Sequence, residues 1–361
     1  MNKSATAKFP AWIVKFACAL VLCLTARAGV VRASAAVAAP QFSVVFDGKE
    51  GKYAVVRTPQ LVVTDRGTLL AFAQGRSGSH DRSDNDIILK RSTDGGETWS
   101  ALQVIADQGK DSLNSICVLQ ERSMGRIFVV GCWFPDGYAM QDIRYLSPAL
   151  QAYHKKAGRE NDPPIQPGYE GPAIQRNYVL HSDDDGRSWS AMRDITRAVK
   201  LPAPEVSCIP GPGNAIQLRT GPHAGRIVVP CYTRGLGRKP SDPERLAYVC
   251  RPYALWSDDG GGTWQRGELA PNGRAAREEH GDETQMVELP GGAIMLNTRA
   301  AGRNVAVSRD GGQTWSPLAE ETKVQTSPTA AGFIRYSGLE NGAKSRLLFS
   351  NPAESGRKRG V

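Results

Sequence analysis

The stretch that decides the fold reads Ser-Thr-Asp-Gly-Gly-Glu-Thr-Trp and occupies residues 92–99. Its pattern, Ser-x-Asp-x-Gly-x-Thr-Trp, returns at residues 257–264 and 308–315, and at residues 182–189 with Ser in place of Thr. Each copy follows a short apolar run, such as residues 87–89, and the copies contain four of the seven tryptophans. One structural unit is therefore expected to occur four times in this chain.

Each copy has the composition of a corner between two strands. The apolar run predicts a strand, Asp and Gly supply the turn, and Thr and Trp open the next strand. The aspartates at positions 94, 184, 259 and 310 are separated by 90, 75 and 51 residues. A propeller blade of four strands takes roughly 40–50 residues. The repeat therefore predicts a propeller or solenoid, in which the first two intervals each hold a blade plus a long loop or most of a second blade.

Residues 1–38 have the composition of a secretory signal peptide. They contain five basic residues and no acidic ones, and an apolar run over residues 16–24 precedes small residues of the Ala-x-Ala type. A membrane anchor is the alternative, but the apolar run is too short to span a bilayer comfortably. We therefore expect export to the periplasm or the extracellular space, no stable membrane insertion after cleavage, and one β domain over residues 41–361.

Composition excludes several classes of function. The formal net charge of +9 falls to about +4 once the five basic residues of 1–38 are removed. No dense Lys/Arg run is interleaved with aromatic residues, so a nucleic-acid partner is not expected. Five cysteines remain, none of them in C-x-x-C spacing, which argues against a zinc or redox site and favours small buried side chains.

Charged side chains stand at the ends of two expected strands. Arg57 follows the apolar residues 53–56, and an arginine at the end of a buried strand must find an anion, because burying it unpaired is costly. Glu283 is an acid that enters a further apolar strand, which ends near residue 289. These positions are candidates for chemistry rather than for packing alone.

Together with these segments, the four copies are Asp boxes, and over about residues 45–361 the chain resembles the bacterial sialidase (neuraminidase) family. The resemblance implies an all-β fold, the six-bladed β-propeller of the sialidase type. It also implies an exo-α-sialidase, which hydrolyses terminal α-linked sialic acids on glycoproteins, glycolipids or oligosaccharides with retention, without a cofactor or metal. The alternative is a non-catalytic Asp-box propeller that binds sialosides or other acidic sugars.

The resemblance assigns two arginines in the first blade. Arg57 and the following Thr58 resemble the family's Arg-Ile-Pro motif, with Thr in place of Ile. Arg57 is then the first arginine of a triad that grips the sialic acid carboxylate, and a salt bridge to a neighbouring blade is the alternative. Arg76, at the end of Gln-Gly-Arg, resembles a second basic position that faces the substrate.

The family's general acid/base is a loop aspartate about ten residues before a basic dipeptide. That dipeptide is at residues 90–91 here, so counting back gives Asp81. Asp84 and Asp86 are local competitors, although Asp86 lies next to the strand and is expected to cap or pair. His80 is expected in a solvated loop.

A second cluster resembles the family pattern Asn-Glu-x-x-Val-Val-Glu-Leu. Glu283 matches the catalytic glutamate, Asp282 stands where Asn is usual, and Glu288 is then a structural acid. Arg299 matches the second triad arginine, and a salt bridge between Glu283 and Arg299 is the alternative for both. Tyr232 matches a tyrosine that lines the sugar pocket, with a buried propeller tyrosine as the alternative.

Two stretches are expected to be loops. Residues 136–176 are rich in Pro, Gly and Tyr, as in a surface excursion near a site, and residues 234–245 are polar.

The end of the sequence departs from the family pattern. Residues 346–352 resemble the strand before the third triad arginine. Arg357 or Arg359 would supply that arginine, spacing favours Arg357, and a free basic tail is the alternative. The family continues with a further blade that carries the nucleophilic tyrosine, and no equivalent is found before Val361. The last blade is therefore expected to be incomplete and the sialidase domain to be truncated at its C-terminus.

The implied chemistry has a physical reason. Sialic acid carries a carboxylate on its anomeric carbon, so a carboxylate nucleophile would approach it against like charge, whereas a neutral tyrosine deprotonated by a glutamate avoids the repulsion. Guanidinium groups hold the substrate carboxylate, and a loop aspartic acid protonates the leaving oxygen and later activates water.

Overall fold

The structure is a computed structural model that describes residues 42–48, 50–239, 242–273, 281–300, 302–324, 329–339 and 344–352. The expected signal peptide and Arg357 lie outside these residues. The chain divides into two units, Met1–Phe42 and Ser43–Val361, and everything below concerns the second. No helix among the described residues has the length and apolarity needed to cross a membrane.

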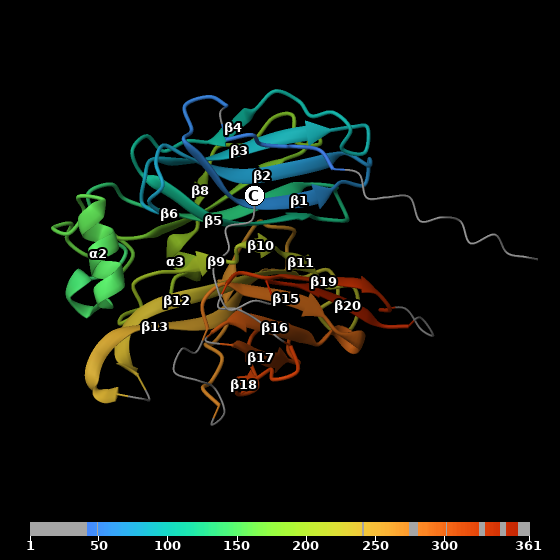
Figure 1. Cartoon of the computed structure of the whole chain (residues 1–361). Helices are drawn as coiled ribbons and strands as arrows, with labels where there is room; N and C mark the ends of the chain where they lie inside the picture. Colours follow the sequence, from blue (N-terminus) through green and yellow to red (C-terminus); the bar gives the residue numbers. More distant parts are fainter. Residues whose placement is uncertain are drawn as a thin grey trace, which may run out of the picture. The chain divides into compact units, whose positions relative to one another are not determined.

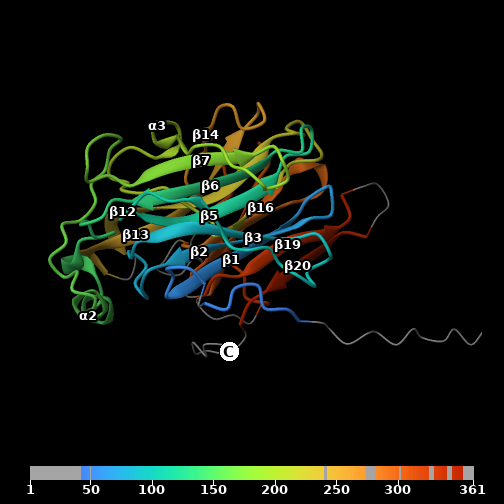
Figure 2. The same cartoon turned by 90° about the horizontal axis from the view of Figure 1, so that it is seen from above.

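The first two blades form one continuous sheet (Figure 1). The strands of the first blade are β1 (Val55–Val63), β2 (Leu69–Arg76), β3 (Asn85–Ser92) and β4 (Gln103–Ala106). Those of the second are β5 (Ser112–Gln120), β6 (Ile127–Phe134), β7 (Arg176–Ser182) and β8 (Arg193–Asp194). Neighbours within each blade are antiparallel, and a single parallel bridge, Asn85 to Ser112, joins the blades. Figure 2 shows β7, β6, β5, β3, β2 and β1 side by side in that order.

Three further sheets follow. The third blade consists of β11 (Ile216–Gln217), β12 (Ile227–Lys239), β13 (Asp242–Ser257) and β14 (Gln265–Arg266), with β9 (Ile209–Pro210) added to β12. The fourth consists of β15 (Thr284–Glu288), β16 (Ile294–Arg299), β17 (Arg303–Ser308) and β18 (Ala319–Glu320). A fifth sheet has two strands, β19 (Gly332–Ser337) and β20 (Arg346–Ser350), and β10 (Gly213–Asn214) pairs with β5.

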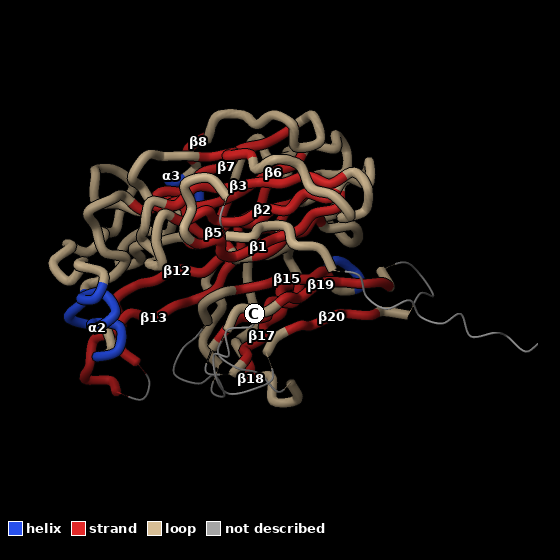
Figure 3. Tube along the Cα trace, turned by 45° about the horizontal axis from the view of Figure 1, so that its top comes forward, coloured by secondary structure: helices blue, strands red, loops and turns tan. Residues whose placement is uncertain are grey.

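The predicted all-β propeller is confirmed. Strands dominate the tube in Figure 3, and the helical segments are the short ones η1 (Ile143–Tyr145), α2 (Pro148–Lys156), α3 (Thr196–Val199) and η2 (Pro290–Gly292). The described residues supply four blades of four strands and two strands of a fifth.

Every Asp box is the turn between the third and fourth strand of its blade. In the first copy the Ser92 hydroxyl accepts a hydrogen bond from the Gly96 amide at 2.9 Å, and the Asp94 carboxylate accepts from the Thr98 amide at 3.0 Å. The second, third and fourth copies repeat these bonds. Each of the four blades with four strands therefore contains one Asp box. The long first interval holds a single blade plus the β6–β7 connection with η1 and α2, and the second holds α3 and the long β12–β13 hairpin.

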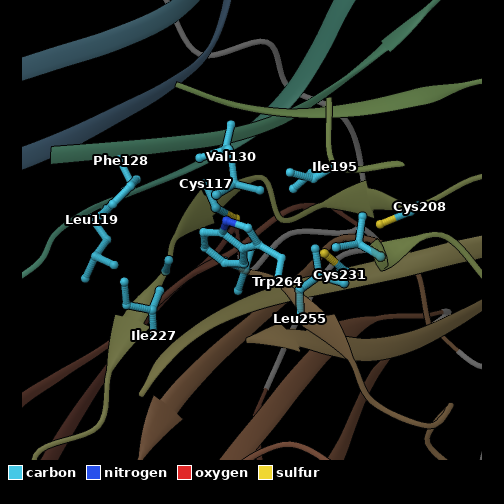
Figure 4. Packing of buried hydrophobic residues seen from close by; sticks show 14 of the residues in the cluster. Cys117, Leu119, Phe128, Val130, Ile195, Cys208, Ile227, Cys231, Leu255 and Trp264 are labelled. Carbon is cyan, nitrogen blue, oxygen red and sulfur yellow. The ribbon is translucent and has the colours of Figure 1, made fainter. Parts of the chain in front are cut away.

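Tryptophans of the boxes pack between blades. Trp264 lies in a buried cluster built from β5, β6, β12 and β13, where Figure 4 shows its indole beside Cys117 and Cys231. The prediction that the thiols are small buried groups is confirmed for four cysteines, while Cys250 is partly exposed. Burial of this apolar surface is the dominant favourable term in holding adjacent blades together.

The polar loop predicted over residues 234–245 is wrong. Arg234 belongs to β12 and faces Cys250 in the antiparallel ladder with β13, which continues to Arg238 opposite Leu246. The segment lacks apolar alternation because its backbone, including Gly235 and Gly237, is held by ladder hydrogen bonds rather than by side-chain burial.

Candidate functional site

Arg76 and Asp81 meet at the end of the first blade. Arg76 closes β2, and its Nη1 donates to Asp81 Oδ1 at 2.5 Å. The Gln74 side chain accepts from Nε of Arg76 at 3.0 Å, which fixes the guanidinium plane from its other side. Arg76 is buried, whereas the Asp81 side chain is 64% exposed. The pair thus presents an open carboxylate on a rigid support.

The backbone of Asp81 is anchored by the second blade and the start of the third strand. Its carbonyl oxygen accepts hydrogen bonds from Asn85 Nδ2, Ser112 Oγ and Asn114 Nδ2, each at 3.0 Å. All three donors are buried. A loop residue held by three buried donors keeps one position, which is what a general acid requires.

Electrostatics keep Asp81 ionised in the free chain. The surrounding protein atoms oppose ionisation, but the charge and hydrogen bond of Arg76 outweigh them and hold the pKa of Asp81 below its usual range. His80 and Arg234 act in the same direction.

His80 is not in a solvated loop, as the sequence predicted, but is buried. Its Nδ1 accepts from the Arg82 amide at 3.0 Å, and its ring stacks on Tyr153 of α2 with centroids 4.7 Å apart. The β6–β7 connection therefore packs directly on the Asp81 loop, and sequence reasoning missed Tyr153 because its helix is far along the chain from that loop.

The competitors of Asp81 have structural partners. Asp86 is fully buried and accepts from the Tyr53 hydroxyl at 2.7 Å, with the Lys52 ammonium 2.9 Å away. This confirms the prediction that Asp86 pairs. Asp84 is partly buried and burial raises its pKa, while its carbonyl accepts from the Ser77 amide.

Arg57 does not end a buried strand, as the sequence predicted, because β1 runs through it and its side chain is exposed. Thr58 has a positive φ of 49°, and the β1–β2 register shifts between Arg57 and Gln60, so a bulge breaks the alternation at this point. No described carboxylate lies within ion-pair distance of Arg57. The alternative of a salt bridge to a neighbouring blade is therefore not found among the described residues.

Glu283 and Arg299 form an ion pair at the end of the fourth blade. Arg299 Nη1 donates to Glu283 Oε2 at 2.8 Å, and the Arg299 amide donates to the Glu283 carbonyl at 3.0 Å. About a quarter of each side chain is exposed, 24% for Glu283 and 26% for Arg299. The pair is the alternative foreseen for both residues, and their roles toward a substrate stay a prediction.

Burial raises the pKa of Glu283 above its usual range. The charge of Arg299 opposes this effect, and the neighbouring carboxylate of Asp282 reinforces it. A glutamate with a raised pKa is a better proton acceptor than an ordinary surface carboxylate.

Tyr232 is buried and lies in an apolar cluster with Cys132, Phe134 and Ile209. Its surroundings include Asp282 and Glu283, whose charges, after burial itself, raise the pKa of the phenol well above its usual range. The alternative of a buried propeller tyrosine is therefore confirmed, and Tyr232 also borders the second cluster. That it lines a sugar pocket stays a prediction.

Sequence reasoning missed Arg234, which lies in the second cluster beside Asp282. Its Nη2 lies 3.3 Å from Asp282 Oδ2, its guanidinium carbon lies 5.6 Å from the centre of the Tyr232 ring, and its charge reaches both Asp81 and Glu283. Extending the strand of Tyr232 by two residues would have placed Arg234 on the same face.

Glu288 has the structural role that the sequence predicted. Its buried carboxylate accepts from the amides of Arg219 and Thr220 and from the Thr220 hydroxyl, at 2.7–3.0 Å. It ties the fourth blade to the β11–β12 turn.

Two surface hollows lie elsewhere. One, of about 590 Å³, is lined mainly by residues 193–198 and 262–264. The other, of about 940 Å³, is lined mainly by residues 121–124, 222–226 and 258–260. Neither contains a residue of the two charged clusters, so the candidate site stands on its charges and contacts rather than on these hollows.

Comparison with known proteins identifies the family of the chain. Residues 67–359 match the model of the BNR repeat-like domain. The sialidase of Micromonospora viridifaciens is 31% identical over 330 residues, which cover 87% of this chain and 44% of that protein. The sialidase of Bacteroides fragilis (strain YCH46) is 27% identical over 314 residues, which cover 83% and 50%. Among solved structures, the Hadza microbial sialidase Hz136 has 27% identity and a TM-score of 0.63, covering 84% of this chain and 54% of that one.

The chain spans about half the length of the curated relatives it matches. Within that span the matched region contains all four Asp boxes and both charged clusters. The chain belongs to the BNR-repeat family of bacterial sialidases.

Proposed function

We propose that this chain recognises terminal α-linked sialic acids on glycoconjugates and carries the site of a retaining exo-α-sialidase. The observation that carries the proposal is the position of Arg234, which lies 3.3 Å from Asp282 beside Glu283 and whose charge also lowers the pKa of Asp81 in the other cluster. Arg57 supports it, because an exposed guanidinium with no carboxylate partner among the described residues is free to bind a ligand carboxylate.

The roles follow from the surroundings of each group. Arg57 and Arg299, with Arg357 outside the described residues, are proposed to hold the substrate carboxylate, and Arg76 keeps Asp81 in place. Asp81 is proposed to protonate the leaving oxygen and then to activate water. Because its pKa is low in the free chain, it takes up the proton more readily at acidic pH or when a bound anion offsets Arg76.

Glu283 is proposed as the base that activates a tyrosine nucleophile. Tyr232 does not suit the role of nucleophile, because burial holds its pKa well above its usual range and opposes ionisation. This observation favours a second candidate function, sialoside binding without turnover by the residues present.

The proposal is tested with a fluorogenic α-sialoside and the purified chain. Fluorophore release that is lost in Glu283→Gln, but kept in Glu97→Gln on the exposed first Asp box, is the expected result. Saturable binding without release would favour the binding function. Absence of both would contradict the proposal. Export, proposed from residues 1–38, is tested by sequencing the N-terminus of the protein recovered outside the cytoplasm.

A further inference from the structure

Arg234 stands on β12, outside the set of residues that the family resemblance assigns. Its Nη2 lies 3.3 Å from Asp282 Oδ2, and the exposed fractions of the two side chains are 17% and 21%. Its Nη1 contacts the Met140 sulfur, and its guanidinium lies over the Tyr232 ring. The guanidinium is thus held between the third blade, the β6–β7 connection and the segment that leads into β15.

Asp282 is rigidly placed beside Glu283. Its amide donates to the Arg299 carbonyl at 2.8 Å, and its carbonyl accepts from the hydroxyls of Thr284 at 2.7 Å and Thr298 at 3.1 Å. The backbone of Asp282 is therefore fixed at the start of the β15–β16 ladder.

Two adjacent carboxylates in a partly desolvated site oppose each other's ionisation. Asp282 raises the pKa of Glu283, and the charges of Arg299 and Arg234 lower it. Arg234 pairs with Asp282, so loss of Arg234 removes the guanidinium that compensates the charge of this carboxylate.

We propose that Arg234 is a positioning residue, which neutralises Asp282 so that Glu283 alone can exchange a proton with the substrate-binding site. The role in catalysis rests on the proposed function, but the pairing itself does not. It also gives a reason for Asp282 at a position where the family pattern has Asn, because the acid comes with an arginine that compensates it.

Other charged and titratable groups face Glu283 and must be counted. Arg299 pairs with Glu283 directly. Arg303 of β17 is fully buried and interacts electrostatically with Glu283. Tyr232 lies on the same side as Arg234. These groups stay in place in all the variants below, so a change in the titration of Glu283 reports on Arg234 and Asp282.

The alternative is that the Arg234–Asp282 pair is only a structural salt bridge between the third and fourth blades. That alternative predicts a loss of stability when either partner is removed, and the same titration of Glu283 in the protein that still folds. The positioning role predicts that the pKa of Glu283 shifts in one direction when Arg234 is removed and in the opposite direction when Asp282 is removed.

The test is a pH titration of the Glu283 carboxyl by NMR in the full chain labelled at glutamate side-chain carbons. The Glu283→Gln variant identifies the signal. Four proteins make up a double-mutant cycle, which is the square of comparisons used below: the unmodified chain, Arg234→Gln, Asp282→Asn and the double variant. Arg251→Gln is the matched control, because Arg251 is also on this sheet and pairs with a different carboxylate, that of Glu205.

The midpoint for Glu283 is expected to rise in Arg234→Gln, to fall in Asp282→Asn, to return between these two in the double variant, and to stay unchanged in Arg251→Gln. If Arg234→Gln does not fold, the downward shift in Asp282→Asn still decides, since no shift there would overturn the proposal. Equal midpoints across the square would also overturn it. Sialosides are not needed, so failure of sialoside binding would count against the proposed function and not against the pairing.

Discussion

Arg299 Nη1 and Glu283 Oε2 lie 2.8 Å apart at the open end of the β15–β16 ladder, sixteen residues apart in sequence (299 − 283 = 16). To bind a ligand carboxylate, Arg299 must give up at least part of its contact with Glu283. Glu283 would then lose its strongest stabilising neighbour, and its proton affinity would rise. Substrate binding and activation of the base are thereby coupled in one pair.

Arg57 is expected to contribute to binding and not to folding. Arg57→Ala should weaken binding of an α-sialoside roughly 10- to 100-fold, the equivalent of one or two charge-assisted hydrogen bonds. Its melting temperature should stay that of the unmodified chain, because the side chain is exposed and has no carboxylate partner among the described residues. Calorimetric titration and thermal melting measure the two quantities, with Arg66→Ala on the exposed β1–β2 turn as the control. A lowered melting temperature with unchanged affinity would restore the salt-bridge interpretation.

Glu288 is expected to show the reverse. Glu288→Gln should destabilise the fold by about 1–3 kcal/mol, because a buried carboxylate that accepts from Arg219 and Thr220 becomes an amide with one acceptor oxygen. Affinity for the sialoside should not change. Urea unfolding of Glu288→Gln beside Glu283→Gln separates the two acids, and an equal loss of stability in both would show that Glu283 is also structural.

His80 is expected to make stability depend on pH. Burial, the main cause, together with the neighbouring His154, lowers the pKa of His80 from 6.5 to about 4. The native state therefore binds fewer protons than the unfolded state between these values, and the stabilising contribution, complete above pH 6.5, is lost as the pH falls toward 4.

The variant that tests this is His80→Phe, which keeps a ring on Tyr153 but cannot be protonated. Its melting temperature should fall less between pH 6.5 and pH 4 than that of the unmodified chain. It should also be somewhat lower at pH 7.5, by the loss of the hydrogen bond to the Arg82 amide. Parallel melting curves for the two proteins across this pH range would contradict the account.

The Asp boxes are expected to fail in acid. Hydrogen bonds from the hydroxyl and amide of Thr98 lower the pKa of Asp94, so its stabilising contribution is present above the unfolded value and is lost as the pH falls through the folded one. Asp94→Asn should reduce the dependence of the melting temperature on pH below 4. Glu97→Gln removes a carboxylate from the same turn and controls for net charge. If the melting temperature of Asp94→Asn depends on pH below 4 as that of the unmodified chain does, the Asp boxes are not the cause of the acid sensitivity.

The fold could be predicted largely because its signal is local. Each Asp box, such as that of Asp94 and Thr98, closes its hydrogen bonds within five residues, so the sequence alone contains the whole corner. The content of the long first interval could not be predicted from the sequence. Nothing within residues 136–176 shows that they form a connection whose helix packs on a loop of the first blade, rather than strands of a further blade.

The candidate site could be predicted only where a motif surrounds the residue. Asp81 and Glu283 stand in such motifs. Arg234 and Tyr153 have no motif of their own. Their positions depend on the β12–β13 ladder and on the path of the β6–β7 connection, which are contacts between segments far apart in sequence.

The most direct test of the central claim is the affinity of the chain for a thio-linked α-sialoside, compared with the same compound as its neutral methyl ester. The account predicts saturable binding of the acid, at least tenfold weaker binding of the ester, and loss of this preference in the Arg57→Ala, Arg299→Ala double variant. Equal binding of acid and ester, or a preference that survives without the two arginines, would contradict recognition of the sialic acid carboxylate at this site.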